Sequence, residues 1–374
     1  MKFIMDKPKI IALYLPQFHC IPENDEFWGK GFTDWETVKK AKPIYEGHDQ
    51  PKVPMGENYY DLSLKENVEW QSNLAKENGI YGFGVYHYWF NNEKNILTKP
   101  AEILCNLKDN PVKYFFVWDN CNWKRSWSNV VGNDWAPVVD GEKNKKGQSI
   151  LIPYILGEEA DWENHYRNIS HHFKSDNYEK KNNKPVFCII WYSKEIQKMC
   201  EYWDKLAKED GYDGMFFVLK NNKFGNYPKG VFRYDYEPHN SSWLDVSFRQ
   251  RIIGKLVSIS KIKIPEKLCL YDYDVCWQKL LKRVSECKDE TLIPGAFIAY
   301  DDSPRRGNTS AKIIVNGTPE KFQTYFSQLF DLCKIQKKEY IFLTAWNEWG
   351  EGAYLEPDIR YGYAYLNAIK NIVL

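Results

Sequence analysis

The feature that most constrains the fold is a series of short apolar runs that alternate with segments of helical character. Apolar runs bounded by turn residues are typical of buried strands. The predicted strands cover residues 10–15, 82–88, 114–118, 186–190, 215–218, 230–234, 295–299 and 340–344. The predicted helices cover residues 64–78, 99–106, 161–173, 195–209, 272–287 and 319–336. Alternation of this kind indicates a parallel α/β protein.

Eight parallel strands favour a closed barrel over an open sheet. No Gly-x-Gly-x-x-Gly pattern follows the first predicted strand, so a dinucleotide-binding fold has no support. The sequence contains no internal repeat and no low-complexity linker. We therefore predict a single (β/α)8 TIM barrel with elaborated βα loops, which occupies residues 1–374 as one catalytic domain. The loop over residues 120–150 includes Trp127 and Trp135, and its length is typical of a lid or a binding element.

In such a barrel the active site lies at the C-terminal ends of the strands. Carboxylate, amide, imidazole and aromatic side chains follow nearly every predicted strand, and barrel closure would bring them together. These side chains include Gln17, His19, His87, Tyr88, Trp89, Asp119, Asn120, Trp123, Asp235, Glu237, Trp346 and Asn347. The sequence therefore predicts a polar and aromatic cleft at this end of the barrel.

The last predicted strand leads into residues 344–352, which hold the carboxylates Glu348 and Glu351 among two tryptophans and two glycines. Glycine allows a sharp turn, and a turn can bring side chains three residues apart onto one face. Paired carboxylates among aromatic rings suit glycosidic-bond chemistry, in which one group protonates the leaving oxygen and the other acts as base or nucleophile. The alternative interpretation is a solvated loop whose glutamates cap the next helix.

The chain is rich in aromatic residues, with 15 Trp, 26 Tyr and 20 Phe. A hydrophobic core does not need so many tryptophans, whereas sugar rings stack on indole and phenol faces and hydrogen-bond to their polar edges. The excess therefore favours a carbohydrate cleft. Within it we expect Trp89 and Trp123 to stack on sugar rings, and His87 and Asn347 to contact hydroxyl groups.

Charge and motif patterns exclude several other functions. The formal net charge of +1 gives no reason to expect nucleic acid or an anionic membrane as a partner. No Gly-x-Ser-x-Gly, Walker or His-Glu-x-x-His pattern is present, and we expect neither a metal nor a cofactor. The adjacent His171 and His172 are interpreted as part of a charged helical stretch.

The cysteines and the N-terminus bear on the compartment. Nine scattered cysteines without a Cys-x-x-Cys pair indicate unpaired thiols in a reducing environment. The first ten residues carry charges and no apolar signal region, and no apolar run reaches the ~18 residues that a membrane helix needs. We therefore expect a cytoplasmic protein without membrane insertion, and the sequence predicts no oligomeric state.

Four separated segments carry a family resemblance. They are residues 14–19, 28–35, 82–90 and 345–358. In this order they resemble the WbsX family, whose proteins carry a domain similar to glycoside hydrolase family 99, the endo-α-mannosidases. The resemblance runs from about residue 10 to the C-terminus. It implies a (β/α)8 barrel without a metal, action on the glycosidic bonds of an oligo- or polysaccharide, and an association with bacterial O-antigen and other surface polysaccharides. It also places Trp35 among the substrate-binding residues.

The resemblance further implies a retaining mechanism, in which a carboxylate acts as base on the sugar's own 2-hydroxyl and gives a 1,2-anhydro intermediate. Carried over by position, it assigns Glu348 as this base and Glu351 as the general acid/base. One departure concerns the segment after the third strand, where family members often read Trp-Ala-Asn-Glu-Asn-Trp. This chain has Asp119 and Cys121 in place of the alanine and the glutamate. The identity of the preferred sugar therefore stays open.

Two alternatives to a hydrolase remain. One is a glycosyltransferase of surface-polysaccharide biosynthesis, for which Asp272-Tyr273-Asp274 has the spacing of a metal-binding Asp-x-Asp motif. This segment opens a predicted helix and is Tyr-rich, which favours a structural role. The other is a non-catalytic glycan-binding protein that keeps the cleft and both glutamates.

Overall fold

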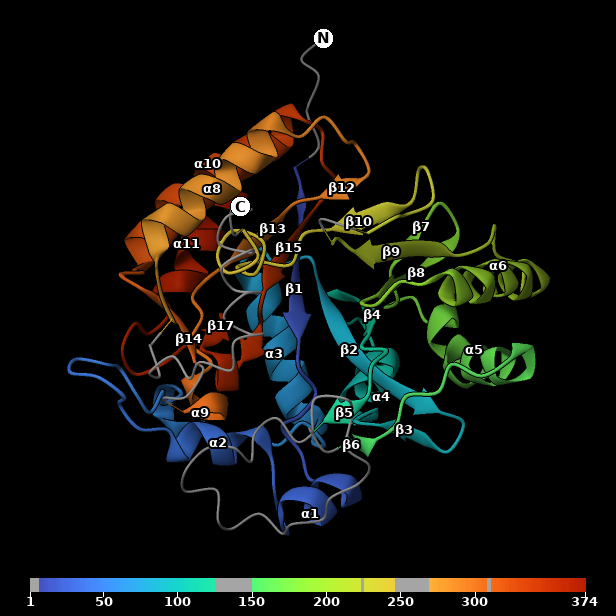
Figure 1. Ribbon diagram of the computed structural model, residues 1–374, viewed down its shortest axis with the longest axis horizontal. Helices are drawn as coiled ribbons and strands as arrows, with labels where there is room; N and C mark the ends of the chain where they lie inside the picture. The colour runs from blue at the N-terminus through green and yellow to red at the C-terminus, as the bar shows by residue number, and fades with distance from the viewer. Residues whose placement is uncertain (1–6, 125–149, 223–224, 246–268, 308–310) are drawn as a thin grey trace, which may run out of the picture.

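The computed structural model describes residues 7–124, 150–222, 225–245, 269–307 and 311–374. A barrel of parallel strands occupies its centre, and helices surround the strands (Figure 1). Most of the loop over residues 120–150, including Trp127 and Trp135, lies outside the described residues. Its predicted role as a lid stays a prediction.

Parallel pairing runs through the central sheet in the order β12-β10-β9-β8-β4-β2-β1-β15-β13. The strands are β1 (Lys9–Tyr14), β2 (Gly82–Asn91), β4 (Lys113–Trp118), β8 (Lys184–Ile189), β9 (Phe216–Lys220), β10 (Phe232–Tyr234), β12 (Leu292–Ile293), β13 (Gly295–Phe297) and β15 (Tyr340–Thr344). Only Pro294 separates β12, which pairs with β10, from β13, which pairs with β15. The two short strands together close the sheet, and this confirms the predicted TIM barrel.

Helices cover the outside of the barrel. They are α3 (Lys65–Glu77), α4 (Lys99–Asn106), α5 (Glu159–Lys174), α6 (Lys194–Glu209), α8 (Tyr273–Glu286), α10 (Pro319–Ile335) and α11 (Ala364–Val373). Local sequence fixes several of their starts. The Ser193 hydroxyl caps α6 by accepting the amide of Ile196, and Thr318 caps α10 by accepting the amide of Lys321. Among the described residues, no helix combines the length and the apolar character that a bilayer crossing requires.

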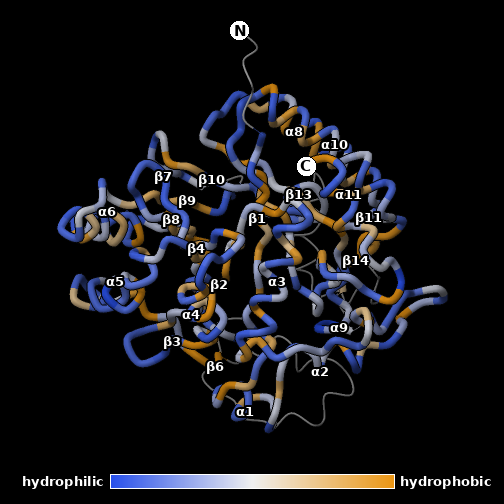
Figure 2. Tube along the Cα trace, turned by 180° about the vertical axis from the view of Figure 1, so that it is seen from behind, coloured by the Kyte–Doolittle hydropathy of each residue, from blue (hydrophilic) through white to orange (hydrophobic). Residues whose placement is uncertain are grey.

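Side chains alternate between the lumen and the helical layer along each strand. On the lumen side, Phe342 of β15 contacts Phe115 of β4 and Tyr234 of β10, with ring centroids 5.7 and 5.0 Å apart. Gly84 of β2 faces the same interior, where a side chain would meet Leu13 and Val117. Figure 2 shows hydrophobic stretches on the central strands and mixed colours along the outer helices. Away from the C-terminal ends of the strands, the lumen is therefore filled by packed side chains.

Further short elements gather where the strands end. They are α1 (Pro22–Trp28), α2 (Asp34–Lys40), η1 (Met55–Glu57), β3 (Lys94–Ile96), β5 (Trp123–Lys124), β6 (Ile150–Ile152), β11 (Cys269–Asp272), α9 (Ser303–Arg306), β14 (Lys312–Val315), β16 (Asn347–Glu348), η2 (Trp349–Glu351) and β17 (Ala353–Tyr354). A further short strand, β7 (Lys180–Lys181), lies elsewhere, because it pairs with the start of β8. In Figure 1, α1, α2, α9 and the β5–β6 hairpin lie beyond the arrowhead of β1. These elements form the C-terminal face of the barrel.

Candidate active site

The segment after β15 turns back sharply and places both glutamates at the C-terminal face. β16 pairs with β17, and the 3-10 turn η2 connects them. Gly352 ends this turn in the left-handed conformation, with φ at 58°, which glycine adopts without strain. Glu348 is buried, whereas about one-fifth of the Glu351 side chain is exposed (20%). One carboxyl group is thus sealed in the protein and the other borders open space.

Glu348 lies in an environment that favours its protonated form. Burial raises the pKa of Glu348 well above its usual range, and the adjacent Glu351 raises this pKa further through its charge and a hydrogen bond. The positive charge of Arg305 and a hydrogen bond from Tyr86 act in the opposite direction. Among the residues that the structure describes, Oε1 of Glu348 has no hydrogen-bond partner. An unpaired buried carboxyl oxygen of this kind is suited to a reacting group.

Arg305 of α9 holds Glu351 in place. Its Nη1 donates to Oε1 of Glu351 at 2.7 Å, and its Nη2 donates to Oδ2 of the buried Asp34 at 2.9 Å. Burial opposes the charge of Arg305, yet Asp34, Glu351 and Glu348 together raise its pKa. A Cβ atom at position 350 would lie 2.7 Å from Nε of Arg305 and 2.8 Å from Oδ2 of Asp34, so Gly350 leaves the space that this ion pair occupies. Glu351 is therefore held in an ion pair beside Glu348, whose environment favours the protonated form.

Tyrosines, rather than tryptophans, surround the two glutamates. Burial raises the pKa of Tyr86, Tyr236 and Tyr300, and the charge of Glu348 adds to the rise in each case. The hydroxyls of Tyr86 and Tyr236 lie 3.3 Å apart. The Lys220 ammonium lies 4.0 Å from the Tyr236 ring centroid; burial lowers its pKa, while nearby carboxylates oppose this change. The lumen thus presents phenol edges and one buried amine to a ligand.

Asp119 also faces this group, at the end of β4. Burial raises the pKa of Asp119, and its carboxylate accepts a hydrogen bond from the Cys121 thiol at 3.1 Å. The charge of Asp119 acts on both Tyr88 and Lys220. The two positions at which this chain departs from the family pattern therefore contact each other, and the departure keeps an acidic group in the lumen.

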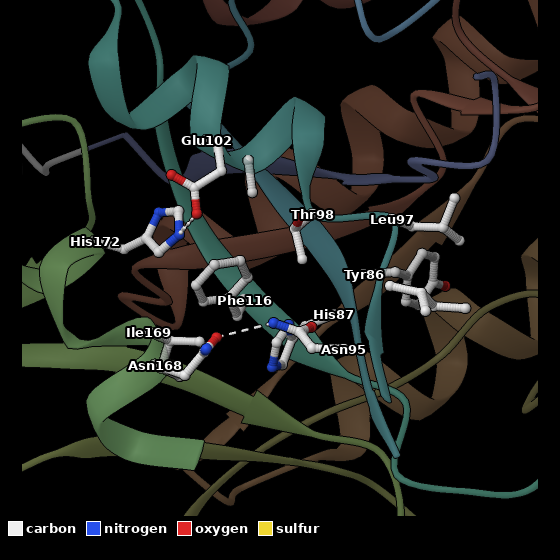
Figure 3. A pocket seen from close by; sticks show the side chains of 12 residues that line it. Tyr86, His87, Asn95, Leu97, Thr98, Glu102, Phe116, Asn168, Ile169 and His172 are labelled. Atoms are coloured by element: carbon white, nitrogen blue, oxygen red, sulfur yellow. Dashed lines mark hydrogen bonds and ion pairs between the residues drawn. The ribbon is translucent and has the colours of Figure 1, made fainter. Parts of the chain in front are cut away.

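The structure does not bring His87 and Trp89 into this group. Along β2, Tyr86 and Tyr88 point into the lumen, so His87 and Trp89 point to the helical layer. Nε2 of His87 lies 2.8 Å from Nε2 of His165 on α5, and the Trp89 ring stacks on the same imidazole at 4.5 Å. Figure 3 shows His87 on the side of β2 that faces Phe116 and α5. The expectation that both side chains contact the ligand is revised, and both belong to the core.

Asp235 and Glu237 form a separate cluster with Arg283 of α8. The Arg283 guanidinium donates to both carboxylates, to Asp235 at 3.1 Å. Glu237 also accepts from the amide and the hydroxyl of Ser241, and burial raises the pKa of Glu237 to about 7. Ion pairing with an outer helix indicates a structural role, so the expectation of substrate contact is revised for these two residues as well.

The two predicted asparagines hold strand ends together. The Asn347 amide accepts from the Leu15 backbone amide at 2.7 Å and donates to the Leu15 carbonyl at 3.0 Å. Asn120 makes the equivalent pair of bonds with Trp191, at 2.8 and 2.7 Å. Both amides are thereby engaged with backbone groups rather than turned to a ligand, so Asn347 positions Glu348 instead of contacting hydroxyl groups.

Three of the predicted aromatic and imidazole residues pack behind the site. Trp346 is fully buried against Phe83, with ring centroids 5.3 Å apart. Trp35 donates its indole N–H to the Tyr60 carbonyl and packs on Trp349. His19 is buried, and burial lowers its pKa. The rings that flank the glutamates in sequence therefore support the motif from outside the lumen.

Gln17, Tyr88 and Trp123 stay candidates for ligand contact. Gln17 is buried at the end of β1, where its backbone carbonyl accepts from the Asp34 amide. Trp123 is half-buried on the β5–β6 hairpin and stacks on Tyr88 at 6.1 Å. Sequence reasoning did not select Tyr86, Lys220, Tyr236, Tyr300 and Arg305, which lie around the glutamates. Tyr86 could have been predicted, because side chains two residues apart on a strand share a face and Tyr88 was already a predicted site residue.

Replacing Asn347 by alanine should lower the free energy of unfolding by about 2–4 kcal/mol, because the amide and carbonyl of Leu15 would both stay buried without a partner. Urea denaturation followed by fluorescence measures this loss. Asn67→Ala is the matched control, because the Asn67 amide makes one exposed bond to the Asp61 carbonyl. Equal stability of the two variants would show that the bonds to Leu15 do not hold the motif.

The fold and the site together define a class. A (β/α)8 barrel whose last strand leads into two glutamates that lie close together in space, with aromatic rings around them, is typical of carbohydrate-active enzymes. Residues 10–369 match the family described as "Glycosyltransferase WbsX". The chain belongs to the WbsX family, which confirms the predicted resemblance.

The chain is also similar to curated proteins and to solved structures. The uncharacterized protein WxcX of Xanthomonas campestris pv. campestris is 27% identical over 372 residues, which are 96% of this chain and 49% of the relative. The chain thus spans about half the length of the curated relatives it matches. Among solved structures, a glycoside hydrolase-like protein aligns with a TM-score of 0.59 at 13% identity, covering 99% of this chain and 95% of that one. The family 99 endo-α-mannosidase of Bacteroides thetaiotaomicron aligns with a TM-score of 0.51 at 12% identity, covering 97% and 95%. These likenesses show the fold.

Proposed function

We propose that this barrel is a retaining endo-glycosidase that cleaves an α-mannoside-like bond within a polysaccharide. The observation that carries the proposal is the contact between the buried Glu348 and the ion-paired Glu351 in a tyrosine-lined lumen. Glu348 acts as the base on the sugar's 2-hydroxyl, and Glu351 acts as general acid and then general base. The family 99 resemblance supplies these two roles.

The proposed reaction has two steps. In the first, Glu348 takes the proton of the 2-hydroxyl, this oxygen attacks the anomeric carbon, and Glu351 protonates the departing oxygen as its bond to that carbon breaks. In the second, Glu351 takes a proton from water, which attacks the anomeric carbon and opens the 1,2-anhydro ring, while Glu348 returns its proton to the 2-oxygen. Two inversions give retention. Since Glu348 favours the proton in the structure, the proton passes to Glu351 through their hydrogen bond before reaction.

Half-buried indoles at the rim are the proposed stacking surfaces. Trp123 stacks on Tyr88, and Trp243 lies 4.9 Å from the Tyr300 ring, so each indole adjoins a tyrosine of the lumen. Lys312 lies 4.6 Å from the Trp243 ring centroid, which adds a cation beside that surface. An indole with one free face suits the apolar face of a pyranose ring.

Wild type incubated with α-mannan and with O-antigen polysaccharides should release oligosaccharides whose new reducing ends first appear as the retained anomer by NMR. Glu348→Gln and Glu351→Gln should release none while they keep affinity for the glycan, because each preserves the shape of the site. Binding without turnover by wild type would identify a non-catalytic glycan-binding protein instead. An initially inverted product would exclude the proposed mechanism.

A glycosyltransferase is the second candidate, because the family description carries that name. The Asp-x-Asp segment does not support it. Asp272 caps α8 by accepting the Val275 amide, and Asp274 accepts from Lys321 and Tyr325. These bonds engage Asp272 at the start of α8 and Asp274 between α8 and α10. Release of nucleoside diphosphate from nucleotide-sugars in the presence of a glycan acceptor would favour the transferase.

A further inference from the structure

We propose that Glu102 of α4 together with His171 and His172 of α5 forms a binding site for a divalent transition metal, with Zn²⁺ as the best match. One ligand atom from each residue lies within 4.8 Å of the other two. Two imidazoles and a carboxylate are a donor set that Zn²⁺ accepts readily. The site lies on the helical layer of the barrel and is separate from the glutamate pair.

The distances fit a tetrahedral ion. Nε2 of His171 and Nε2 of His172 each lie 3.1 Å from the same oxygen, Oε1 of Glu102. With bonds of about 2.0–2.2 Å to nitrogen and oxygen, tetrahedral Zn²⁺ separates its ligand atoms by roughly 3.3–3.5 Å. For these two nitrogen–oxygen pairs a shift of a few tenths of an ångström would admit the ion, and the two histidine ligand atoms lie within 4.8 Å of each other.

The convergence of two consecutive histidines is itself unusual. Neighbouring residues on an α-helix point about 100° apart, so their side chains normally diverge. Here the two rings lie 4.2 Å apart by their centroids and address one carboxylate. The His172 side chain is buried (3% exposed), while those of His171 and Glu102 are exposed by 50% and 39%. The buried ring anchors the site, and the open side leaves room for an ion to enter and for water as a fourth ligand.

A second contact orients the buried imidazole. Nδ1 of His172 lies 2.7 Å from the Tyr114 hydroxyl of β4, which directs Nε2 toward Glu102. When Nε2 binds a metal, Nδ1 carries the proton and can donate a hydrogen bond to the phenol oxygen. Such an outer contact is usual for metal-bound histidine. Figure 3 shows Glu102 and His172 pointing toward each other, with Phe116 beside them.

The bound ion would join α4 to α5, which pack on the outer face of β2 and β4. It would act as a structural clamp, because the strands separate it from the lumen. This proposal departs from the sequence-based expectation of no metal. That expectation depended on spacing within one helix, whereas these ligands come from two helices and acquire their geometry only on folding.

Equilibrium dialysis and calorimetry of chelator-treated protein with Zn²⁺ test the site. Wild type should bind one Zn²⁺ saturably and gain thermal stability with it. His171→Ala and Glu102→Gln should each weaken this binding by at least ~10–100-fold. Glu163→Gln is the matched control. It removes a carboxylate of α5 that pairs with Arg167 and Tyr202 and not with the proposed ligands. It should bind like wild type.

Cobalt spectroscopy distinguishes this site from the nine thiols of the chain. Co²⁺ bound here should show the visible bands of a tetrahedral ion without a thiolate charge-transfer band, and His171→Ala should remove them. The proposal fails if wild type binds no ion saturably, if the variants bind Zn²⁺ as wild type does, or if the cobalt spectrum is that of a thiolate site.

Discussion

Replacing Glu351 by alanine should reduce hydrolysis of the polysaccharide by about 10²–10⁴-fold and leave much of the activity toward an aryl glycoside with a good leaving group. The natural leaving oxygen needs a proton, and Glu351 is the proposed donor. A nitrophenolate departs without one, so loss of the acid matters little for that substrate. Initial rates on both substrates measure the difference.

Glu348→Ala is the contrasting variant, and it should lose activity toward both substrates because no group remains to activate the 2-hydroxyl. The structure makes this comparison decisive. Burial next to Glu351 favours a proton on Glu348, which by itself would suit the acid role. If the aryl glycoside rescues Glu348→Ala and not Glu351→Ala, the two roles are exchanged.

The same electrostatics predict the pH dependence. The glutamate pair must keep one proton, which Glu351 needs as general acid. Because the pKa of Glu348 is raised in the folded protein, this proton is lost only as pH rises through that raised value, and the activity should fall there. The linkage to stability has the same sign. A carboxyl group whose pKa is raised by folding contributes stability below its unfolded pKa and loses this contribution as pH rises through the folded value. Glu348→Gln should therefore reduce the loss of stability with rising pH.

The strands and helices could be predicted from sequence because each follows from local periodicity. The eight predicted strands all occur, and their order in the barrel follows from alternation with helices. The short strand β12, which Pro294 separates from the seventh predicted strand, was not foreseen, although a proline at that position removes a ladder donor. Local patterns thus determine where strands lie better than where they are interrupted.

The candidate site was predicted less completely. The position of a residue at a strand end shows that it lies near the site, but it does not show whether its side chain points into the lumen. His87 and Tyr88 are adjacent, yet one faces α5 and the other the lumen. Charge pairing is equally invisible in sequence. Arg305 and Asp34 are separated by 271 positions and meet only because α2 and α9 pack on the same turn. The aromatic residues also have two different roles. Buried tryptophans pack behind the segment that holds the glutamates, whereas tyrosines face the glutamates.

Replacing Arg305 by glutamine should lower the free energy of unfolding by about 3–5 kcal/mol, because Asp34 would stay buried without its cation. The variant should also shift the falling limb of the pH–activity profile to higher pH. Arg305 opposes the rise in the pKa of Glu348, so its removal makes ionisation of Glu348 harder still. Chemical denaturation and initial rates across pH measure the two effects.

The loss of unfolding free energy in the Arg305→Gln variant should itself depend on pH. In the variant, low pH protonates the carboxylates that have lost their partner, so the stability deficit should be smaller at about pH 5 than at about pH 8. Arg360→Gln is the matched control: its side chain is 52% exposed and pairs with Asp49 at the surface, which predicts a loss below about 1 kcal/mol. The double variant Arg305→Gln with Asp34→Asn should recover part of the lost stability and none of the pH shift, because Glu348 and Glu351 would still lack their cation. A deficit that is constant with pH, or a full recovery of the profile in the double variant, would show that Arg305 acts on packing and not on the charge of the glutamate pair.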